Sequence, residues 1–317
     1  MPRKALIFGV SSQDGSYLAE LLLSKEYEVY GLVRSSSKSE RISHIIDRIK
    51  LIKGDMTDYA SIEEAVKRAQ PDEVYNLTAQ SSYETSISVP MTTCDVTAMG
   101  ALRVYEAVRK NKPDAKVFQA SSSEVFGSTK ETPQTEKTRF HPRSPYGVAK
   151  VFAHEMARFY RENHKLFISC GILYNHTSPR QSNEFVMKKI VEGVANIKKG
   201  LAERITLGNL NTSRDLGYAK DYVEAMWLCL QQPVADEFVI GTGDTHTVKQ
   251  FLEAVCEVAG VEFWNAFTQD PTFDRQSQDD CLRADIRKTQ TVLKWTPKVG
   301  FEELVRIMYE AESSHTR

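Results

Sequence analysis

Four side chains in the sequence could together move protons: Ser122, Glu124, Tyr146 and Lys150. On a helix, the spacing of Tyr146 and Lys150 places both side chains on the same face. A neighbouring ammonium lowers the pKa of a tyrosine, so its phenolate becomes available as a base near neutral pH. A Tyr–Lys pair at this spacing also occurs by chance on protein surfaces. The serine and the glutamate make acid–base catalysis the stronger hypothesis.

Alternating strands and helices in the first 175 residues would bring these side chains together. Apolar strands are predicted at 5–8, 28–33, 49–53, 73–77, 116–120 and 167–173. Helices are predicted between them, at 15–24, 61–69, 97–110 and 145–163. This alternation predicts a parallel sheet with right-handed crossovers. Ser122 and Glu124 directly follow a strand, so they should emerge at the carboxyl edge of that sheet.

The pattern of the chain loosens after residue 175. It predicts a helix, a strand, a second helix and a second strand at 184–198, 204–207, 218–231 and 237–240, and a polar loop at 270–280. We therefore predict an α/β fold, with a Rossmann-type, doubly wound parallel sheet at 1–174. A smaller mixed α/β domain for substrate is expected at 175–317, with segments near 211–242 rejoining the main sheet. It would cover the carboxyl ends of the strands, where open α/β sheets bind ligands.

The turn after the first strand has the glycine spacing of a dinucleotide-binding loop. Gly9 can form the tight turn, and Gly15 lets the following helix pack close to the sheet. The helix N-terminus, with Ser12, Gln13 and Asp14, would offer backbone N–H groups to a pyrophosphate. Ser12 replaces the central glycine of such loops, and its hydroxyl could donate to a phosphate. Taken alone, the loop could also be an ordinary strand–turn–helix.

The residue after the second strand is expected to select the cofactor. An acidic side chain there would accept from the ribose 2′-hydroxyl of NAD, whereas this chain has Arg34. A guanidinium suits a 2′-phosphate, so we predict NADP, with a solvated surface arginine as the alternative. Asp55, past the third strand, could accept from the adenine amine. Residues 78–80, past the fourth strand, should lie against the middle of the cofactor.

Composition excludes several other classes of protein. The 41 basic and 42 acidic side chains give a net charge of -1, whereas nucleic-acid binders usually carry a basic excess. The hydrophobic fraction of 41% is too high for a typical disordered chain. Five scattered cysteines and seven unclustered histidines predict no metal site. No run approaches the roughly 18 apolar residues that cross a bilayer, and no signal-peptide core is present, so we predict a cytoplasmic protein without a membrane segment.

Five segments of the chain resemble the extended short-chain dehydrogenase family and, within it, the GDP-mannose 4,6-dehydratases. They are residues 13–23, 74–77, 143–150, 171–176 and 214–227, and they lie in both predicted domains. The resemblance implies a nucleotide-sugar 4,6-dehydratase that converts GDP-mannose to GDP-4-keto-6-deoxymannose. Internal hydride transfer through NADP and loss of water would achieve this conversion. The resemblance also implies a homodimer or homotetramer.

The resemblance assigns roles residue by residue. Tyr146 would take the proton of the C4 hydroxyl, Ser122 would hydrogen-bond the reacting oxygen and Lys150 would keep the tyrosine acidic. Glu124 would remove the proton at C5. Cofactor contacts are implied for Gly9, Ser12, Gln13, Asp14, Gly15, Arg34, Asp55, Met56, Leu77, Ala79, Tyr146 and Lys150. Substrate contacts are implied for Ser81, Asn175, Lys189, Arg214 and Arg275, whose amide and cationic donors suit a diphosphate.

The sequence leaves alternatives to this function. The chain has Arg34-Ser35 where the family tends to have two arginines, and Ser122 where the family has threonine. A related substrate such as a GDP-heptose therefore stays open, as does a reductase, epimerase or decarboxylase of the same fold. A non-enzymatic alternative is a protein that senses NADP(H) and signals to a partner. The complete set of four acid–base side chains argues against a sensor, which needs none of them.

Overall fold

The structure, a computed structural model, describes residues 2–34, 39–270, 272 and 282–314 of the chain. Its main element is a seven-stranded sheet with the strand order β10-β6-β5-β4-β1-β2-β3. The strands are β1 (Lys4–Phe8), β2 (Glu28–Val33), β3 (Lys50–Lys53), β4 (Glu73–Asn76), β5 (Lys116–Ser122), β6 (Ile168–Leu173) and β10 (Glu237–Ile240). All neighbouring pairs are parallel, which confirms the predicted doubly wound sheet.

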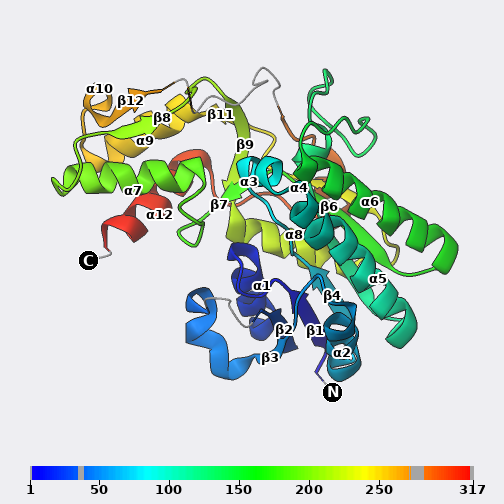
Figure 1. Ribbon diagram of the computed structural model, residues 1–317. Helices are drawn as coiled ribbons and strands as arrows, with labels where there is room; N and C mark the ends of the chain where they lie inside the picture. Colours follow the sequence, from blue (N-terminus) through cyan, green and yellow to red (C-terminus); the bar gives the residue numbers. More distant parts are fainter. Residues whose placement is uncertain (1, 35–38, 271, 273–281, 315–317) are drawn as a thin grey trace.

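Helices cover both faces of this sheet, which explains why the central parts of its strands are largely apolar. On one face lie α2 (Tyr59–Ala69), α5 (Gly100–Asn111) and α6 (Pro145–His164) (Figure 1). On the other face lie α1 (Gln13–Ser24) and α8 (Ala219–Gln231). The strand order reverses between β1 and β4, and ligands of open α/β sheets bind beyond such a point.

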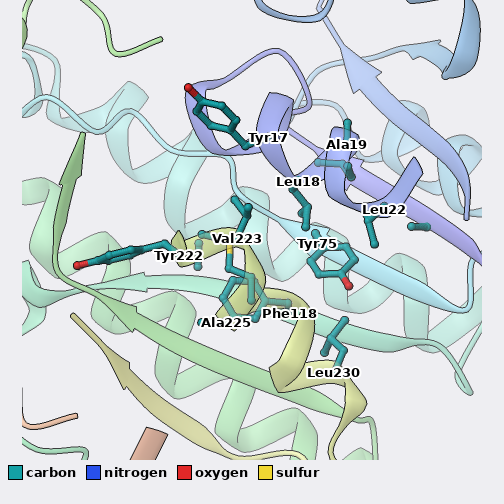
Figure 2. Close-up of a cluster of buried hydrophobic side chains, with 14 of the residues drawn as sticks. Tyr17, Leu18, Ala19, Leu22, Tyr75, Phe118, Tyr222, Val223, Ala225 and Leu230 are labelled. Atoms are coloured by element: carbon teal, nitrogen blue, oxygen red, sulfur yellow. The ribbon is translucent and has the colours of Figure 1, made fainter. Parts of the chain in front are cut away.

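The packing of α1 and α8 holds the carboxyl edge of the sheet in place. Figure 2 shows this layer, in which Tyr75 of β4 and Phe118 of β5 pack with Leu18 and Leu22 of α1 and with Val223 of α8. Each of these side chains is almost fully buried. Burying one large apolar side chain stabilises a fold by about 1.5–3 kcal/mol. The positions at which α1 begins and β5 ends are therefore fixed by a rigid core.

The remaining elements form a smaller layer next to the main sheet (Figure 1). A three-stranded sheet joins β7 (Asn175–Thr177), β9 (Ser213–Tyr218) and β11 (Thr245–Thr247), and β8 (Ile205–Leu207) pairs with β12 (Phe267–Gln269). A separate apolar core lies between α7 (Val186–Lys198), α9 (Val248–Ala259) and α12 (Phe301–Ser313). The short α10 (Phe263–Ala266) contacts α9, and α11 (Arg287–Leu293) contacts β10.

Several elements differ from the sequence predictions. Within residues 211–242, β10 joins the main sheet as expected, whereas β9 pairs with β7 and β11. The helices α9 to α12 and the strands β7, β9, β11 and β12 of the second half of the chain were not predicted. Four short elements between residues 40 and 99 were also not predicted as separate elements, because they lack apolar periodicity over a sufficient length. They are the 3₁₀ helix η1 (Glu40–Arg48), α3 (Tyr83–Ser88), α4 (Pro90–Cys94) and the π turn η2 (Asp95–Met99). In the part of the chain that the structure describes, no helix is long and apolar enough to span a bilayer.

Candidate active site

A cleft of about 370 Å³ lies at the carboxyl edge of the main sheet. Its walls come from the β1–α1 turn, the ends of β4, β5 and β6, the start of α6, and β7. Eleven of the predicted site residues line it from these different elements: Ser12, Gln13, Asp14, Leu77, Ala79, Ser81, Ser122, Glu124, Tyr146, Lys150 and Asn175. A second pocket, of about 610 Å³, lies at the amino ends of β1, β4 and β5 and contains none of the predicted catalytic residues.

Ser122 and Tyr146 meet where β5 ends and α6 begins. Ser144 caps α6 by accepting a hydrogen bond from the backbone N–H of Gly147 at 3.0 Å, and this fixes the first turn that carries Tyr146. Ser122 is hydrogen-bonded to the Tyr146 phenol oxygen. One turn further along α6, the ammonium of Lys150 donates to the carbonyl of Ala120 at 2.6 Å. The expected Ser–Tyr–Lys arrangement is therefore assembled in the cleft.

Burial and neighbouring charges shift the pKa values of both Tyr146 and Lys150. Burial raises the pKa of Tyr146 above its ordinary value; the hydrogen bond with Ser122 lowers it, while the charges of Glu124 and Asp14 raise it further. Burial also lowers the pKa of Lys150 to about 8, against the opposing charge of Asp14. Lys150 is not among the groups that shift the pKa of Tyr146 here, so its predicted role in making the phenol acidic stays a prediction. The raised pKa of Tyr146 reflects the cost of burying a phenolate near two carboxylates.

Glu124 contributes a carboxylate to the same cleft. It lies in the short 3₁₀ turn η3 (Ser123–Val125) that follows β5, and its backbone N–H donates to Ser122 Oγ at 3.2 Å. Its Oε2 is buried, and no hydrogen-bond partner for it lies among the described residues. A buried acceptor without a partner is costly unless a ligand supplies a donor. Glu124 is therefore placed to take a proton from a molecule in the cleft.

The β1–α1 turn has the geometry that a dinucleotide requires. Gly9 has a φ of 90°, which side-chain-bearing residues rarely adopt. A Cβ at Gly15 would lie 2.1 Å from the Gly9 carbonyl oxygen, so only glycine allows this approach. Ser12 caps α1 by accepting from the Gly15 N–H at 3.0 Å, which leaves its hydroxyl proton available to a phosphate.

Two other residues of this turn contact the smaller layer. Gln13 Oε1 accepts from the Ser178 hydroxyl at 2.8 Å, and Asp14 Oδ2 lies 3.0 Å from Nε2 of His176. His176 is a cleft residue that the sequence analysis did not assign to the site. A signal for it was present, because it follows Asn175 directly after the sixth predicted strand.

The residues expected around the adenosine half of the cofactor are divided between surface and core. Arg34 is exposed at the end of β2. Asp55 accepts from the backbone and side chain of Thr57, and these bonds, together with the charge of Arg34, lower the pKa of Asp55. Met56 is buried in the core of the main sheet, and Leu77 and Ala79 line the cleft.

The residues expected to bind substrate are also separated. Ser81 and Asn175 line the cleft. Lys189, on α7, donates instead to the carbonyl of Thr206 at 2.7 Å, and Arg214 is buried in β9; neither is a lining residue. Arg275 lies outside the described residues. Among the described residues, no three histidine, cysteine, aspartate or glutamate side chains lie close enough together to hold a metal ion.

The chain is similar to known proteins over nearly its whole length. Residues 6–308 match the family model described as GDP-mannose 4,6 dehydratase. GDP-mannose 4,6 dehydratase 1 of Arabidopsis thaliana is 46% identical over 98% of this chain and 90% of its own length. The Homo sapiens protein is 42% identical over 97% and 91%, and the Vibrio cholerae protein is 40% identical over 96% and 92%.

Solved structures show the same fold. UDP-glucose 4-epimerase of Thermus thermophilus, in complex with NAD, has a TM-score of 0.87 and 25% identity, covering 98% of this chain and 99% of its own. dTDP-glucose 4,6-dehydratase of Bacillus anthracis has a TM-score of 0.85 and 21% identity, covering 98% and 96%. Since the sequence match extends through both layers of the structure, the chain belongs to the GDP-mannose 4,6-dehydratase family.

Proposed function

We propose that this protein is an NADP-dependent 4,6-dehydratase that converts GDP-mannose to GDP-4-keto-6-deoxymannose with loss of water. The observation that carries the proposal is the buried Oε2 of Glu124, which has no hydrogen-bond partner among the described residues and lies in the same cleft as Ser122, Tyr146 and Lys150. An epimerase needs only redox chemistry at C4, whereas a dehydratase also needs a group that moves protons at C5 and C6. Family membership supports the same substrate.

The described residues fit a dinucleotide. The approach of Gly9 to Gly15 and the N-terminus of α1, which lines the cleft, suit a pyrophosphate, and Arg34 suits a 2′-phosphate. Leu77 and Ala79 line the cleft between this turn and Tyr146. When bound, NADP would supply a site that accepts a hydride and later returns it. We propose residues 1–174 as the unit that holds this cofactor and most of 175–317 as the unit that holds substrate.

The roles of the protein side chains follow from their positions. Tyr146 exchanges a proton with the C4 oxygen of the sugar, and the hydrogen bond from Ser122 favours the phenolate form. Lys150 holds the end of β5 through the Ala120 carbonyl and adds positive charge when protonated. A ketone at C4 acidifies the C5 hydrogen, which Glu124 removes. The same carboxyl group then donates to the C6 hydroxyl, which leaves as water.

Mass spectrometry of the product tests this function. The protein is incubated with NADP and, separately, with GDP-mannose, a GDP-heptose and several UDP- and dTDP-sugars. We expect GDP-mannose to lose the mass of one water. A product of unchanged mass would identify an epimerase, and loss of water only from another sugar would replace the substrate. No product with any sugar, together with tight NADP binding, would favour the sensor.

The assembly and location of the protein are part of the same proposal. The family relationship supports a homodimer or homotetramer that works in the cytoplasm on a soluble nucleotide sugar. Light scattering of the purified protein would give its mass relative to the 35.9 kDa chain. A monomer at assay concentration would contradict this part without affecting the proposed reaction.

A further inference from the structure

One face of α6 is connected to the end of β5 at three successive turns. Tyr146, Lys150 and His154 are spaced by four residues, so their side chains follow one another along the helix. Their partners are three consecutive residues of β5. The carbonyl of Ala120 accepts from Lys150, the hydroxyl of Ser121 contacts His154, and the hydroxyl of Ser122 contacts Tyr146. The proposed mechanism uses the connections of Lys150 and Tyr146 and gives no role to that of His154.

His154 is fully buried, and its two ring nitrogens face different strands. Nδ1 lies 3.1 Å from Ser121 Oγ, and Nε2 lies 3.3 Å from Oε2 of Glu237 on β10. The second contact is electrostatic rather than a well-aligned hydrogen bond. A carboxylate can only accept, so Nε2 presents a proton toward Glu237, and Nδ1 lies within hydrogen-bond reach of the Ser121 hydroxyl. A chain of carboxylate, imidazole and hydroxyl therefore runs from β10 through α6 to β5.

Glu237 is itself held firmly. Arg161 contacts its Oε1 at 2.7 Å and Arg158 contacts the same oxygen at 3.2 Å. Phe140 packs edge-on against the His154 ring with centroids 5.0 Å apart. These contacts leave the imidazole little freedom to rotate, so the position of Ser121 is coupled to two arginine–glutamate ion pairs.

Neither His154 nor Glu237 lines the cleft, whereas Ser121 does. An effect of His154 on the reaction can pass through Ser121, which directly precedes Ser122 and the turn carrying Glu124, and through α6 itself, which carries Tyr146 and Lys150. We propose that His154, oriented by Glu237, is a positioning residue that sets the register of β5 against α6 and so the placement of the acid–base groups. The proposal rests on the proposed dehydratase function.

Steady-state kinetics with GDP-mannose tests the proposal on three variants. Ser121→Ala removes only the hydroxyl that contacts His154, and His154→Phe removes both polar contacts while keeping a planar ring. We expect each to lower kcat by about tenfold, equivalent to about 1.4 kcal/mol, with KM changed less than about twofold. Ser169→Ala is the control, because Ser169 is a buried serine on the adjacent β6 whose hydroxyl accepts from the Asp236 N–H at 3.2 Å.

The double variant Ser121→Ala/His154→Phe separates positioning from general destabilisation. If both residues act through one contact, its kcat should equal that of the worse single variant. Multiplied losses, a kcat loss of the same size in Ser169→Ala, or a normal kcat in Ser121→Ala would overturn the proposal.

Hydrogen exchange keeps the proposal testable if the proposed function fails. If the unmodified protein does not dehydrate GDP-mannose, the proposed function is rejected. The register of β5 against α6 can then still be measured by hydrogen exchange, which needs no reaction. The Glu124 amide donates to Ser122 Oγ, so its exchange reports the register. We expect peptides covering residues 120–126 to exchange faster in Ser121→Ala and His154→Phe than in Ser169→Ala. Equal exchange in all three would reject a positioning role.

Discussion

The carboxylate of Asp14 lies 3.0 Å from Nε2 of His176 and joins the first turn of α1 to β7. The other ring nitrogen, Nδ1, lies 2.7 Å from the carbonyl of Tyr174. Both partners are acceptors, so the arrangement favours an imidazolium that donates twice. Burial opposes this charge, but the charge and hydrogen bond of Asp14 outweigh it and raise the pKa of His176. The pKa of Asp14 is lowered, because contacts with His176 and Gln13 and the charge of Lys150 together outweigh burial.

This pair predicts stability that declines as pH rises. The raised pKa of His176 gives a contribution that is complete below 6.5, the ordinary value, and is lost as pH rises through the folded value. The lowered pKa of Asp14 gives a contribution that is present above 3.8 and is lost as pH falls. His176→Asn should therefore cost about 1.5–3 kcal/mol near pH 5 and much less near pH 9. Urea unfolding at both pH values measures this, and a cost independent of pH would contradict it.

Lys150 should trade stability for activity. Burial lowers its folded pKa to about 8 from 10.5, so the folded protein binds fewer protons than the unfolded chain between these values. Stability therefore rises with pH across this window, and below it the buried charge costs up to about 3 kcal/mol. Lys150→Met should raise the free energy of unfolding at pH 7 by up to that amount and lower kcat by at least about 100-fold. A destabilised Lys150→Met protein would show that the bond to Ala120 outweighs the cost of burial.

Much of the main sheet and of the cleft could be predicted, because local patterns specify them. Apolar segments separated by helices predict a parallel sheet, as observed, and the spacing of Gly9 and Gly15 reflects a close backbone approach. The Tyr146–Lys150 spacing likewise reflects a single helix face. These constraints act within a few residues of one another, so they leave a signal in the sequence.

The rest depends on contacts between distant segments. Asp14 and His176 are 162 residues apart, and Glu237 approaches His154 only because β10 adds to the sheet beside β6. The raised pKa of Tyr146 follows from its burial, which spacing cannot reveal. Lys189 was expected at the substrate, but its ammonium donates to the carbonyl of Thr206 in this structure.

Gly15 should tolerate no side chain. A Cβ there would lie 2.1 Å from the Gly9 carbonyl oxygen and 2.8 Å from Cα of Val10, and backbone atoms cannot move aside cheaply. Gly15→Ala should therefore cost about 3 kcal/mol of stability and weaken NADP binding. The control is Gly300→Ala, since nothing lies within 4 Å of a Cβ at that position. Both changes reduce the entropy of the unfolded chain equally, so the difference between their free energies of unfolding in urea isolates the clash at Gly15. Similar costs for the two variants would contradict the predicted clash.

Glu124 should be required for loss of water but not for oxidation at C4. Glu124→Gln keeps the size of the side chain and removes its basicity, while Ser122, Tyr146 and Lys150 stay in place. We expect kcat for dehydration to fall by about 100-fold or more. Mass spectrometry of the product and incorporation of solvent deuterium at C5 would both report the loss. Near-normal turnover of Glu124→Gln would show that another group removes the C5 proton.

Arg34 should determine the preference for NADP over NAD. It is exposed at the end of β2, where the 2′-position of a bound adenosine would lie in a fold of this type. A charged hydrogen bond to a 2′-phosphate contributes about 1.5–3 kcal/mol, so Arg34→Ala should weaken NADP binding by roughly 10- to 100-fold. Its affinity for NAD, which lacks that phosphate, should change less than about twofold. Calorimetric titration with both dinucleotides measures this, and Arg68→Ala, an exposed arginine on α2, controls for the loss of one surface charge. Equal weakening of NADP and NAD binding would show that Arg34 supports the loop rather than reading the 2′-phosphate.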